Sequence, residues 1–341
     1  MVILKSYGDP DLYRNYYRNQ AGYALPGYNG APVMYGAGRV YRSWKLNYSN
    51  DTLNTQFSAG LFYKYTAAQH ESTALDGDNK GFVKRAALAA ESRKIDLLGQ
   101  LHSDLFFQEK LLLNGMDVKN KLTRSKDAFC LMVDDLNRGC KLNILSASLF
   151  VKKLRVAPGV CLGHAEVLFT ANAKYPVDHV GIKVFRIPAG SCVSNQVNLF
   201  LGQLPKLLVI ELVDKEFFSG VHNKNPFNFR HYDINFFALY LDGEQVPTKP
   251  LQTNFEGGNC VREYMQLVQA TGKHMKDRSL LVNREEFAQG YTLFAFDLSP
   301  DQECADHYSL IKTGNLQAEV WLARALPHTV NVIVYVFLTT L

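Results

Sequence analysis

From Tyr41 onward, the sequence alternates apolar and polar residues with a period of two almost everywhere. Successive side chains of a β-strand point to opposite faces, so this period is typical of strands with one buried face. The strands predicted in this way cover residues 95–101, 116–122, 142–154, 180–187, 197–201, 207–213, 234–241, 291–298, 316–322 and 330–338. Within 142–154 the apolar parity flips, which predicts a β-bulge or a corner where the strand changes sheet.

Helical spacing is rare in the same pattern. Apolar side chains recur at helical spacing over residues 261–268 and stop before Gly272, which predicts one short helix, and a further turn or two is expected over 163–171. Asp242-Gly243 predicts a hairpin turn. Many short strands, separated by turn signals and long crossing loops, predict an all-β antiparallel sandwich of the jelly-roll type.

The composition agrees with a folded, well-cored protein. The chain has 341 residues, 47% of them hydrophobic and 20% charged, which is enough for one large domain or two ordinary ones. Its start has no apolar run of signal-peptide length, and the apolar end is far shorter than the ~20 residues of a membrane helix. Six cysteines without C-x-x-C spacing predict reduced thiols of an intracellular, non-secreted protein (Cys130, Cys140, Cys161, Cys192, Cys260 and Cys304).

Residues 1–40 differ from the rest because tyrosine, glycine and proline are interleaved there without any period, which predicts a flexible arm. Residues 1–46 carry six Lys or Arg against two Asp, a balance of +4 out of the chain's net +5. The body is therefore nearly neutral, and nucleic-acid binding by it has little support. The arm is either a disordered leader or a segment that orders on a partner, with weak nucleic-acid contact as one option.

The motifs of catalytic and metal sites are missing from the sequence. It has no G-x-S-x-G, H-E-x-x-H or G-x-x-x-x-G-K-[ST] pattern. Cys304 and His307 form one C-x-x-H pair without a second pair at ligand spacing, and Asp134-Asp135 is better interpreted as an acidic turn. We therefore predict no enzyme activity, no catalytic or metal-binding residues and no cofactor.

The blocks between Asn198 and Gln252 are rich in Asn, Pro, Phe and Tyr, and such residues build close-packed loops and contact surfaces. Pro226 disfavours helix at the residue before it, and the phenylalanines that follow need burial. This loop is predicted to be rigid and to dock either on its own sandwich or on a neighbouring subunit. His231 is interpreted as a loop histidine packed against Phe227 and Phe229. The candidate subunit-contact residues are Asn225, Pro226, Phe227, Phe229, His231, Tyr232, Pro247 and Pro250.

Further blocks make the chain resemble a known family. They are Gly60-Leu-Phe-Tyr-Lys-Tyr-Thr-Ala, Asp96-Leu-Leu-Gly-Gln-Leu-His-Ser-Asp-Leu-Phe-Phe-Gln, Arg124-Ser-Lys-Asp-Ala-Phe-Cys-Leu-Met, Ala173-Lys-Tyr-Pro, Gly290-Tyr-Thr-Leu-Phe-Ala-Phe-Asp-Leu-Ser-Pro and Thr329-Val-Asn-Val-Ile-Val-Tyr. From about Tyr41 the chain resembles the adenovirus-hexon-like major capsid protein of Polinton (Maverick) elements and adintoviruses. The resemblance implies a double jelly roll that trimerises and tiles an icosahedral shell with other capsid proteins such as a penton, in the virion and in the nucleus or cytoplasm of a host cell.

The resemblance divides the chain into a flexible basic arm (1–40), a partial first jelly roll (41–138) and a second jelly roll (139–341). Eight strands with their loops need roughly 120 residues, which only the last part provides. A decayed or fused genomic copy would explain the incomplete first jelly roll. Trimers are expected to bury the loops 219–232 and 242–260.

A second hypothesis, from another class, is a jelly-roll module that binds a ligand such as a carbohydrate. It would need an exposed aromatic–carboxylate cluster on one concave sheet. Phe236, Tyr240 and Phe296 could contribute to such a cluster, but their alternation with other apolar residues favours a place in the core.

Overall fold

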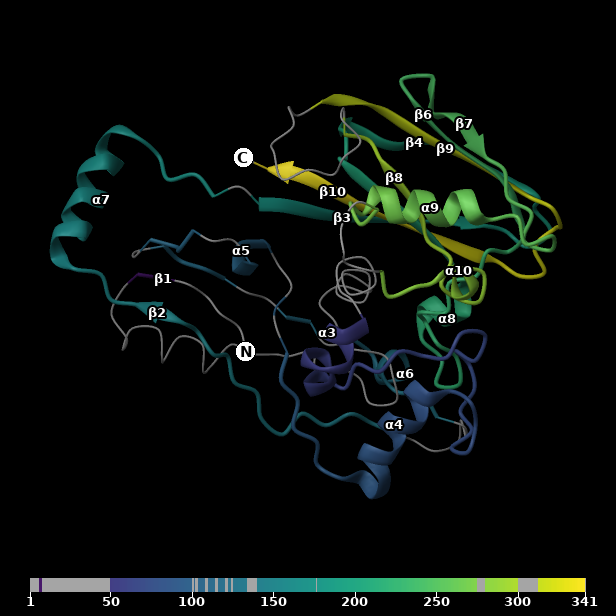
Figure 1. Cartoon of the computed structure of the whole chain (residues 1–341), viewed down its shortest axis with the longest axis horizontal. Coiled ribbons are helices and arrows are strands. Elements are labelled where there is room, and N and C mark those ends of the chain that lie inside the picture. Colours follow the sequence, from purple (N-terminus) through teal and green to yellow (C-terminus); the bar gives the residue numbers. More distant parts are fainter. Residues whose placement is uncertain are drawn as a thin grey trace.

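The computed structural model describes residues 6–7, 50–99, 101, 104–107, 110–113, 116–119, 122–123, 125–133, 140–175, 177–274, 280–299 and 312–340. Figure 1 shows two parts. A sandwich of two β-sheets occupies the chain from Val177 onward, and a part rich in helices and loops, from residues 50–175, lies below and beside it.

The sandwich is a complete jelly roll. Its strands are β3 (Val177–Ile187), β4 (Val193–Gln203), β5 (Leu207–Asp214), β6 (Ile234–Leu241), β7 (Glu244–Leu251), β8 (Phe294–Asp297), β9 (Thr313–Leu322) and β10 (Val330–Thr340). One sheet has the order β3-β10-β5-β8 and the other β4-β9-β6-β7, with antiparallel neighbours throughout. Counted along the chain from β3, these orders are 1-8-3-6 and 2-7-4-5, and every connection except the β6–β7 hairpin changes sheet. This winding confirms the predicted C-terminal jelly roll.

Alternation along the strands creates two apolar layers. The even-numbered valines of β10 face the space between the sheets, together with Leu208 and Ile210 of β5. The opposite faces of the same strands, including Val209 and Tyr335, belong to a second cluster. That cluster is covered by α9 (Val261–Ala270) and α10 (Arg284–Phe287). β5 is therefore buried along its whole length, as its nearly continuous apolar sequence requires.

Two of the three aromatic residues expected in the core lie elsewhere. Phe296 is in the layer between the sheets, as expected. Phe236 and Tyr240 are only half-buried and face outward from β6, so their predicted place in the core is wrong. The pairing of β6 with β9 shifts register between Ile234 and Phe236, and this irregularity breaks the simple alternation on which the prediction depended.

The helices outside the sandwich are short. They are α3 (Asn50–Asn54), α4 (Lys80–Ala89), α5 (Asp104–Phe107), α6 (Asp127–Cys130), α7 (Pro158–Thr170) and α8 (Lys215–Ser219), with 3₁₀ turns at Gln56–Gly60 and Ala90–Ser92. The predicted helix at 261–268 is confirmed as α9, and the turn expected at 163–171 is the longer α7. Of the helices in the described ranges, none is both long and apolar enough to span a bilayer.

The strands expected at 95–101, 116–122 and 142–154 are wrong for the described residues. Only β2 (Lys153–Leu154) forms a ladder there, in parallel with β1 (Ser6–Tyr7), and the bulge or corner expected near it does not occur. A period of two produces a strand only where a second strand accepts its backbone hydrogen bonds. Without such a partner these stretches run as loops, and the partial first jelly roll over 41–138 stays a prediction.

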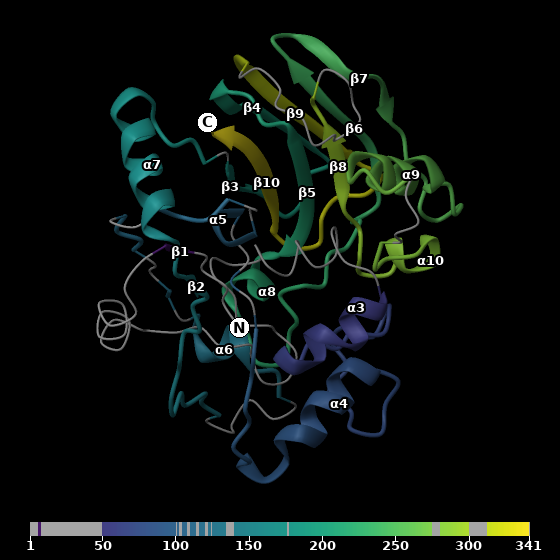
Figure 2. The same cartoon turned by 60° about the vertical axis from the view of Figure 1, so that its left-hand side comes forward.

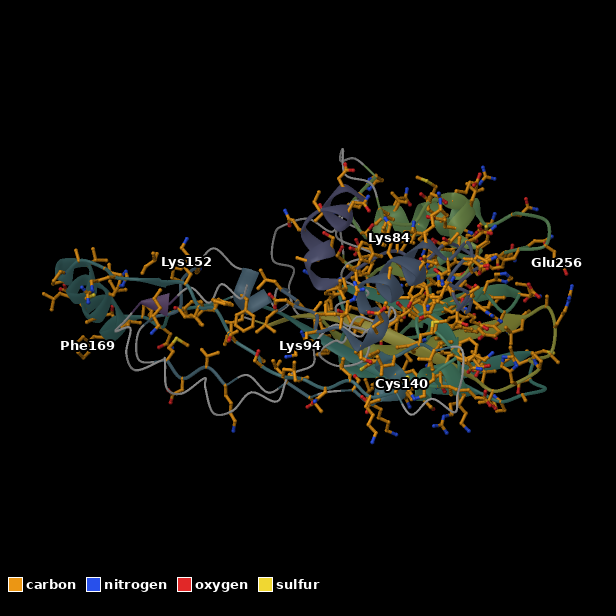
Figure 3. The ribbon with its side chains drawn as sticks, turned by 90° about the horizontal axis from the view of Figure 1, so that it is seen from below. Lys84, Lys94, Cys140, Lys152, Phe169 and Glu256 are labelled. Carbon is orange, nitrogen blue, oxygen red and sulfur yellow. The ribbon has the colours of Figure 1, made fainter. Side chains whose placement is uncertain are left out.

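Residues 143–175, here called the α7 extension, project away from the sandwich, whereas Cys140 and Leu142 before them pack against Cys130 and Leu131. Figure 3 shows Phe169 and Lys152 at one end of the elongated molecule and Glu256 at the other. No residue of α7 is buried. A small cluster around Leu101 and Leu112 supports the base of the extension, with Leu149 and Val151 packed against it.

Candidate subunit-contact surface

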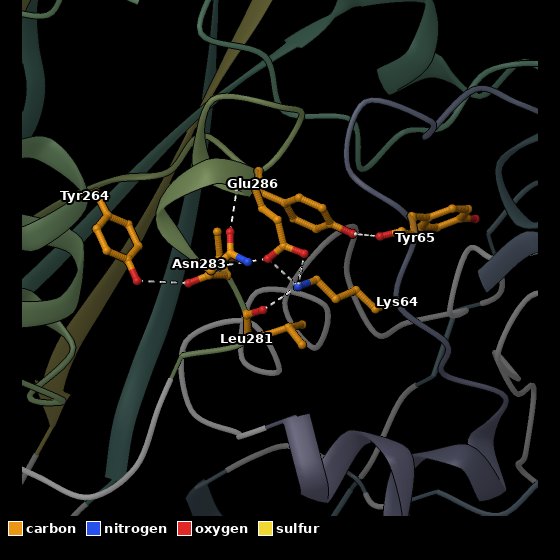
Figure 4. A network of polar contacts seen from close by, with 8 residues as sticks. Lys64, Tyr65, Tyr264, Leu281, Asn283 and Glu286 are labelled. Carbon is orange, nitrogen blue, oxygen red and sulfur yellow. Dashed lines mark hydrogen bonds and ion pairs between the residues drawn. The ribbon is translucent and has the colours of Figure 1, made fainter. Parts of the chain in front are cut away.

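Residues 61–72, here called the strap, hold the N-terminal part of the chain against the jelly roll. The Lys64 ammonium forms an ion pair with Glu286 at 2.5 Å and donates a hydrogen bond to the Leu281 carbonyl at 2.6 Å (Figure 4). Glu286 also belongs to a capping box with Asn283 at the start of α10. One carboxylate therefore begins the helix and anchors the strap to it.

The His70 side chain of the strap lies against the backbone of Gly290 and leaves no space for a side chain there. The ring centroids of His70 and Tyr291 are 4.5 Å apart. The Tyr291 hydroxyl donates a hydrogen bond to the Tyr65 carbonyl at 2.7 Å. A Cβ on Gly290, where φ is +93°, would lie 2.6 Å from the His70 ring. Only glycine accommodates both this backbone conformation and this approach.

The loop 225–230 packs against its own chain. The Asn225 side chain accepts the N–H of Phe227 at 3.0 Å and donates to the His70 carbonyl at 3.1 Å. Phe227 and Phe229 are 2% and 1% exposed and pack edge-on against each other. Pro226 is buried with them. These four candidate residues hold the loop in place from within.

Glu71 of the strap completes the docking of this loop. It accepts a hydrogen bond from the Asn228 amide at 2.7 Å and pairs with Arg230. The Lys224 ammonium also pairs with the Glu71 carboxylate, at 3.4 Å. The polar groups of the loop and of the strap thus serve as each other's hydrogen-bond and ion-pair partners. Buried and half-buried polar groups need such partners.

His231 lies at the end of the sandwich, half-buried. Its ring stacks on Phe255 with centroids 4.0 Å apart, and its Nδ1 accepts the backbone N–H of Asp233 at 3.0 Å. Burial lowers the pKa of His231 below its ordinary value, while Asp233 raises that pKa and Arg230 lowers it. A neutral ring agrees with Nδ1 acting as an acceptor.

The expected packing of His231 against Phe227 and Phe229 is wrong. Tyr232 and Asp233, which follow it, have φ values of 47° and 51°, in the left-handed region. This tight turn places the histidine ring against Phe255 instead, while the two phenylalanines stay below the strap.

Pro247 and Pro250 lie on β7, the outermost strand of its sheet, where both are half-buried. Proline has no N–H to offer to a further strand, and Arg262 donates to the carbonyls of Lys249 and Pro250 at 2.7 Å each. This edge of the sandwich is therefore closed to strand addition.

The opposite side of the sandwich, formed by β3 and β4, exposes apolar residues that the sequence pattern did not single out. Ile182 and Val184 are exposed on β3, and Val197 and Leu201 on β4. The Lys183 ammonium bridges the two sheets by donating to the Leu199 carbonyl on β4 at 2.6 Å. Alternation predicted these strands but could not tell which of their faces would be covered.

A further uncovered apolar element is the helix α7. Leu162 is 71% exposed, Val167 60% and Phe169 91%. A groove of about 490 Å³ lies between the helix and residues 110–113. The apolar run in the sequence was the signal for this helix. It was predicted to form only a turn or two, which is shorter than the helix observed.

Among the residues that the structure describes, no group of three or more His, Cys, Asp or Glu is placed to bind a metal ion. The buried loop side chains are engaged with the strap, and the half-buried His231, Tyr232, Pro247 and Pro250 are the members of the predicted set with accessible surface.

No protein-family model matches the chain. It is 25% identical over 317 residues to the uncharacterized protein F54H12.2 of Caenorhabditis elegans, a match that covers 91% of this chain and 70% of that protein.

Similar solved structures include the major capsid protein P2 from bacteriophage PM2, with a TM-score of 0.27 and 10% identity over 50% of this chain and 47% of that one. The PBCV-1 virus capsid matches with a TM-score of 0.31 and 8% identity, over 51% of each chain. The chain thus spans about half the length of either capsid protein. At TM-scores this low, the strand order and not the likeness identifies the jelly roll.

Proposed function

We propose that this protein is a capsid-like structural protein whose subunits associate as trimers and tile an icosahedral shell. The observation that carries the proposal is the contrast between a jelly roll whose loops are closed by its own chain and an α7 extension whose apolar side chains are uncovered. The resemblance of its sequence blocks to hexon-like capsid proteins of Polinton elements and adintoviruses supports the same function.

The uncovered helix calls for a partner on physical grounds. A helix that is apolar on all sides is normally buried, and contiguous apolar patches on a protein surface mark contact sites. Residues such as Leu162 and Phe169 supply the large apolar side chains found at the centre of stable interfaces. A second copy of the chain, with its exposed β3 and β4 residues, presents apolar surface that such a helix can cover.

The predicted trimer contacts at 219–232 and 242–260 belong to the same proposal, although the second range contains the strand β7 and is not all loop. Half-buried His231 and Pro247 can contact a neighbour directly. Phe227 and Phe229 contribute by holding the loop rigid, which lowers the entropy that ordering would cost on assembly.

Sedimentation velocity and negative-stain microscopy of the purified chain test the assembly. We expect trimers and larger particles for the unmodified protein, and a shift toward monomers for the double variant Leu162→Glu and Phe169→Glu. The matched control is Leu75→Glu, because Leu75 is also exposed, at 68%, but lies outside the α7 extension. Well-folded monomers of the unmodified protein at high concentration, or equal assembly of the double variant, would contradict the proposal.

The proposed partners are further copies of the chain, other capsid proteins such as a penton, and nucleic acid through the basic residues of 1–40. The proposed location is the virion and the nucleus or cytoplasm of the host cell. Of residues 1–40, only 6–7 are among those described. A chain that lacks 1–40 is expected to lose DNA affinity and its salt dependence. Unchanged DNA binding after that deletion would remove this partner.

A further inference from the structure

An aromatic platform lies on the outer face of the sheet β4-β9-β6-β7. Trp321 of β9 and Phe236 of β6 are register partners, and their rings stack with centroids 4.6 Å apart and planes 27° from parallel. Trp321 is 43% exposed. Val193, its partner on β4, is exposed at the other side of the tryptophan. The three residues form one row across the sheet.

A single carboxylate orients the polar aromatic groups of this face. Glu319 accepts the indole N–H of Trp321 at 2.9 Å through Oε1 and the hydroxyl of Tyr240 at 3.0 Å through Oε2. The tryptophan is therefore fixed from two sides, by the stack on Phe236 and by this hydrogen bond. Each carboxylate oxygen has two lone-pair positions, so each keeps one for a further donor.

The platform faces away from the rest of the molecule. In Figures 1 and 2 its sheet is the outermost layer, and the other sheet separates it from α3, α4, α6 and α8. Amide side chains border it, because Asn195 is the register partner of Glu319 and Gln317 that of Tyr240. Tryptophan side chains are large and are highly buried on average, so an exposed and rigidly held one is informative.

We propose that this platform binds a carbohydrate through Trp321, Glu319 and the neighbouring amides. One face of a pyranose ring is formed by C–H groups and fits flat on an indole ring. Its hydroxyls lie at the rim, where they can donate to Glu319 and exchange hydrogen bonds with Asn195 and Gln317. This inference does not rest on the proposed shell.

The geometry favours a sugar over a cation. A cage for a quaternary ammonium group needs rings on several sides of the charge. Phe236 instead covers one face of the Trp321 ring in a nearly parallel stack, so no gap for a cation lies between the two rings. The carboxylate is already shared by two donors, Trp321 and Tyr240, which spreads its charge over the rim of that plane.

Tryptophan fluorescence gives a direct test, because the chain holds two tryptophans, Trp44 and Trp321. The variant Trp44→Phe leaves Trp321 as the single reporter. It is titrated with soluble oligosaccharides of the gluco, galacto and manno series and with N-acetylglucosamine oligomers. We expect a saturable change in emission with at least one series. No saturable change with any of the four series would overturn the proposal.

Calorimetry with the responding sugar then assigns the site. Trp321→Ala is expected to weaken binding by about tenfold or more, while Tyr240→Phe, which keeps the ring and frees one oxygen of Glu319, has a smaller effect. Phe169→Ala is the matched control, because Phe169 is also an exposed aromatic residue but lies on α7. The sugar affinity of this variant should equal that of the unmodified protein. Circular dichroism establishes that each variant is folded.

Three results would contradict a carbohydrate site at the platform. Equal affinity of Trp321→Ala and unmodified protein would place the sugar elsewhere. A saturable response to tetramethylammonium in place of the sugars would indicate a cation site. Loss of self-association in Trp321→Ala, seen by sedimentation without any sugar response, would make the platform a contact between copies of the chain.

Discussion

At the scale of single residues, the polar groups between the strap and the loop 225–230 decide how the N-terminal part meets the jelly roll. The Glu71 carboxylate accepts a hydrogen bond from Asn228 and forms an ion pair with Arg230. The Asn225 amide donates a hydrogen bond to the His70 carbonyl. Each of these bonds joins residues far apart in the sequence. Leaving one such buried group without its partner costs about 1–3 kcal/mol, so the contact is specific as well as stabilising.

His231 should make the stability of the protein depend on pH. Burial lowers its folded pKa below the ordinary 6.5, so the unfolded chain takes up a proton first as the pH falls. The contribution of His231 to the free energy of unfolding should therefore be largest above pH 6.5. It should fall as the pH drops through 6.5 toward the lower folded pKa. Urea unfolding at about pH 7.5 and about pH 5.5 measures the difference.

Two histidine variants separate this effect from the general acid response. His231→Phe keeps a ring to stack on Phe255 and should show a smaller loss of stability between the two pH values. His274→Phe replaces an exposed histidine and should retain the full loss. Equal pH dependence in both variants would show that protonation of His231 does not contribute.

At the scale of elements, the strap and the sheet edges explain which surfaces are available. The strap covers the apolar face of β5 and β10 together with α9 and α10, so those faces are closed. β7 carries prolines, and β8 is short and packed against α9. The β3 and β4 side has exposed apolar side chains instead. Edges protected by proline or by a covering helix resist pairing with another chain, so contacts are directed to the other side.

Gly290 provides a test of how tightly the strap is packed. Gly290→Ala would place a methyl group 2.6 Å from the His70 ring and 2.7 Å from Asn228 Oδ1. Both of those side chains are held, the ring between aromatic neighbours and the amide by Glu71, so neither can move freely. Gly202→Ala is the matched control, because its φ is also positive but nothing lies within 4 Å of the added group.

The free energy of unfolding, measured with urea, should fall further for Gly290→Ala than for Gly202→Ala, by about 1–3 kcal/mol. Both variants share the cost of placing alanine in the left-handed region. The difference between them therefore measures the overpacking alone. A difference near zero would mean that the strap can lift from the loop at little cost.

At the scale of the whole molecule, the chain is a closed sandwich joined to an open extension. The two apolar layers of the jelly roll involve residues from Phe57 to Val336, so the strap and the sandwich should unfold together. The α7 extension has only a small cluster at its base and no buried residue in its helix. Stability is therefore unevenly distributed between the two parts.

Limited proteolysis should reveal this difference. Lys152 and Arg155 are exposed in the α7 extension, where few buried contacts hold the backbone. We expect trypsin to cut the monomeric protein there before it cuts within residues 177–274, as read by mass spectrometry of the fragments. First cuts inside the jelly-roll strands would contradict the proposed distribution of stability.

Local periods and turn residues were enough to predict every strand of the jelly roll except β7, the helix α9 and the hairpin turn at Asp242-Gly243. The segment that became β7 was expected to be part of a loop. The sequence also indicated a rigid loop around Phe227 and Phe229. Long-range packing accounts for the rest: 142–154 is mostly not a strand, Phe236 faces outward and the strap covers the loop. A period describes the side chains of one segment, whereas ladder partners, covered faces and docking surfaces come from segments far away in the chain.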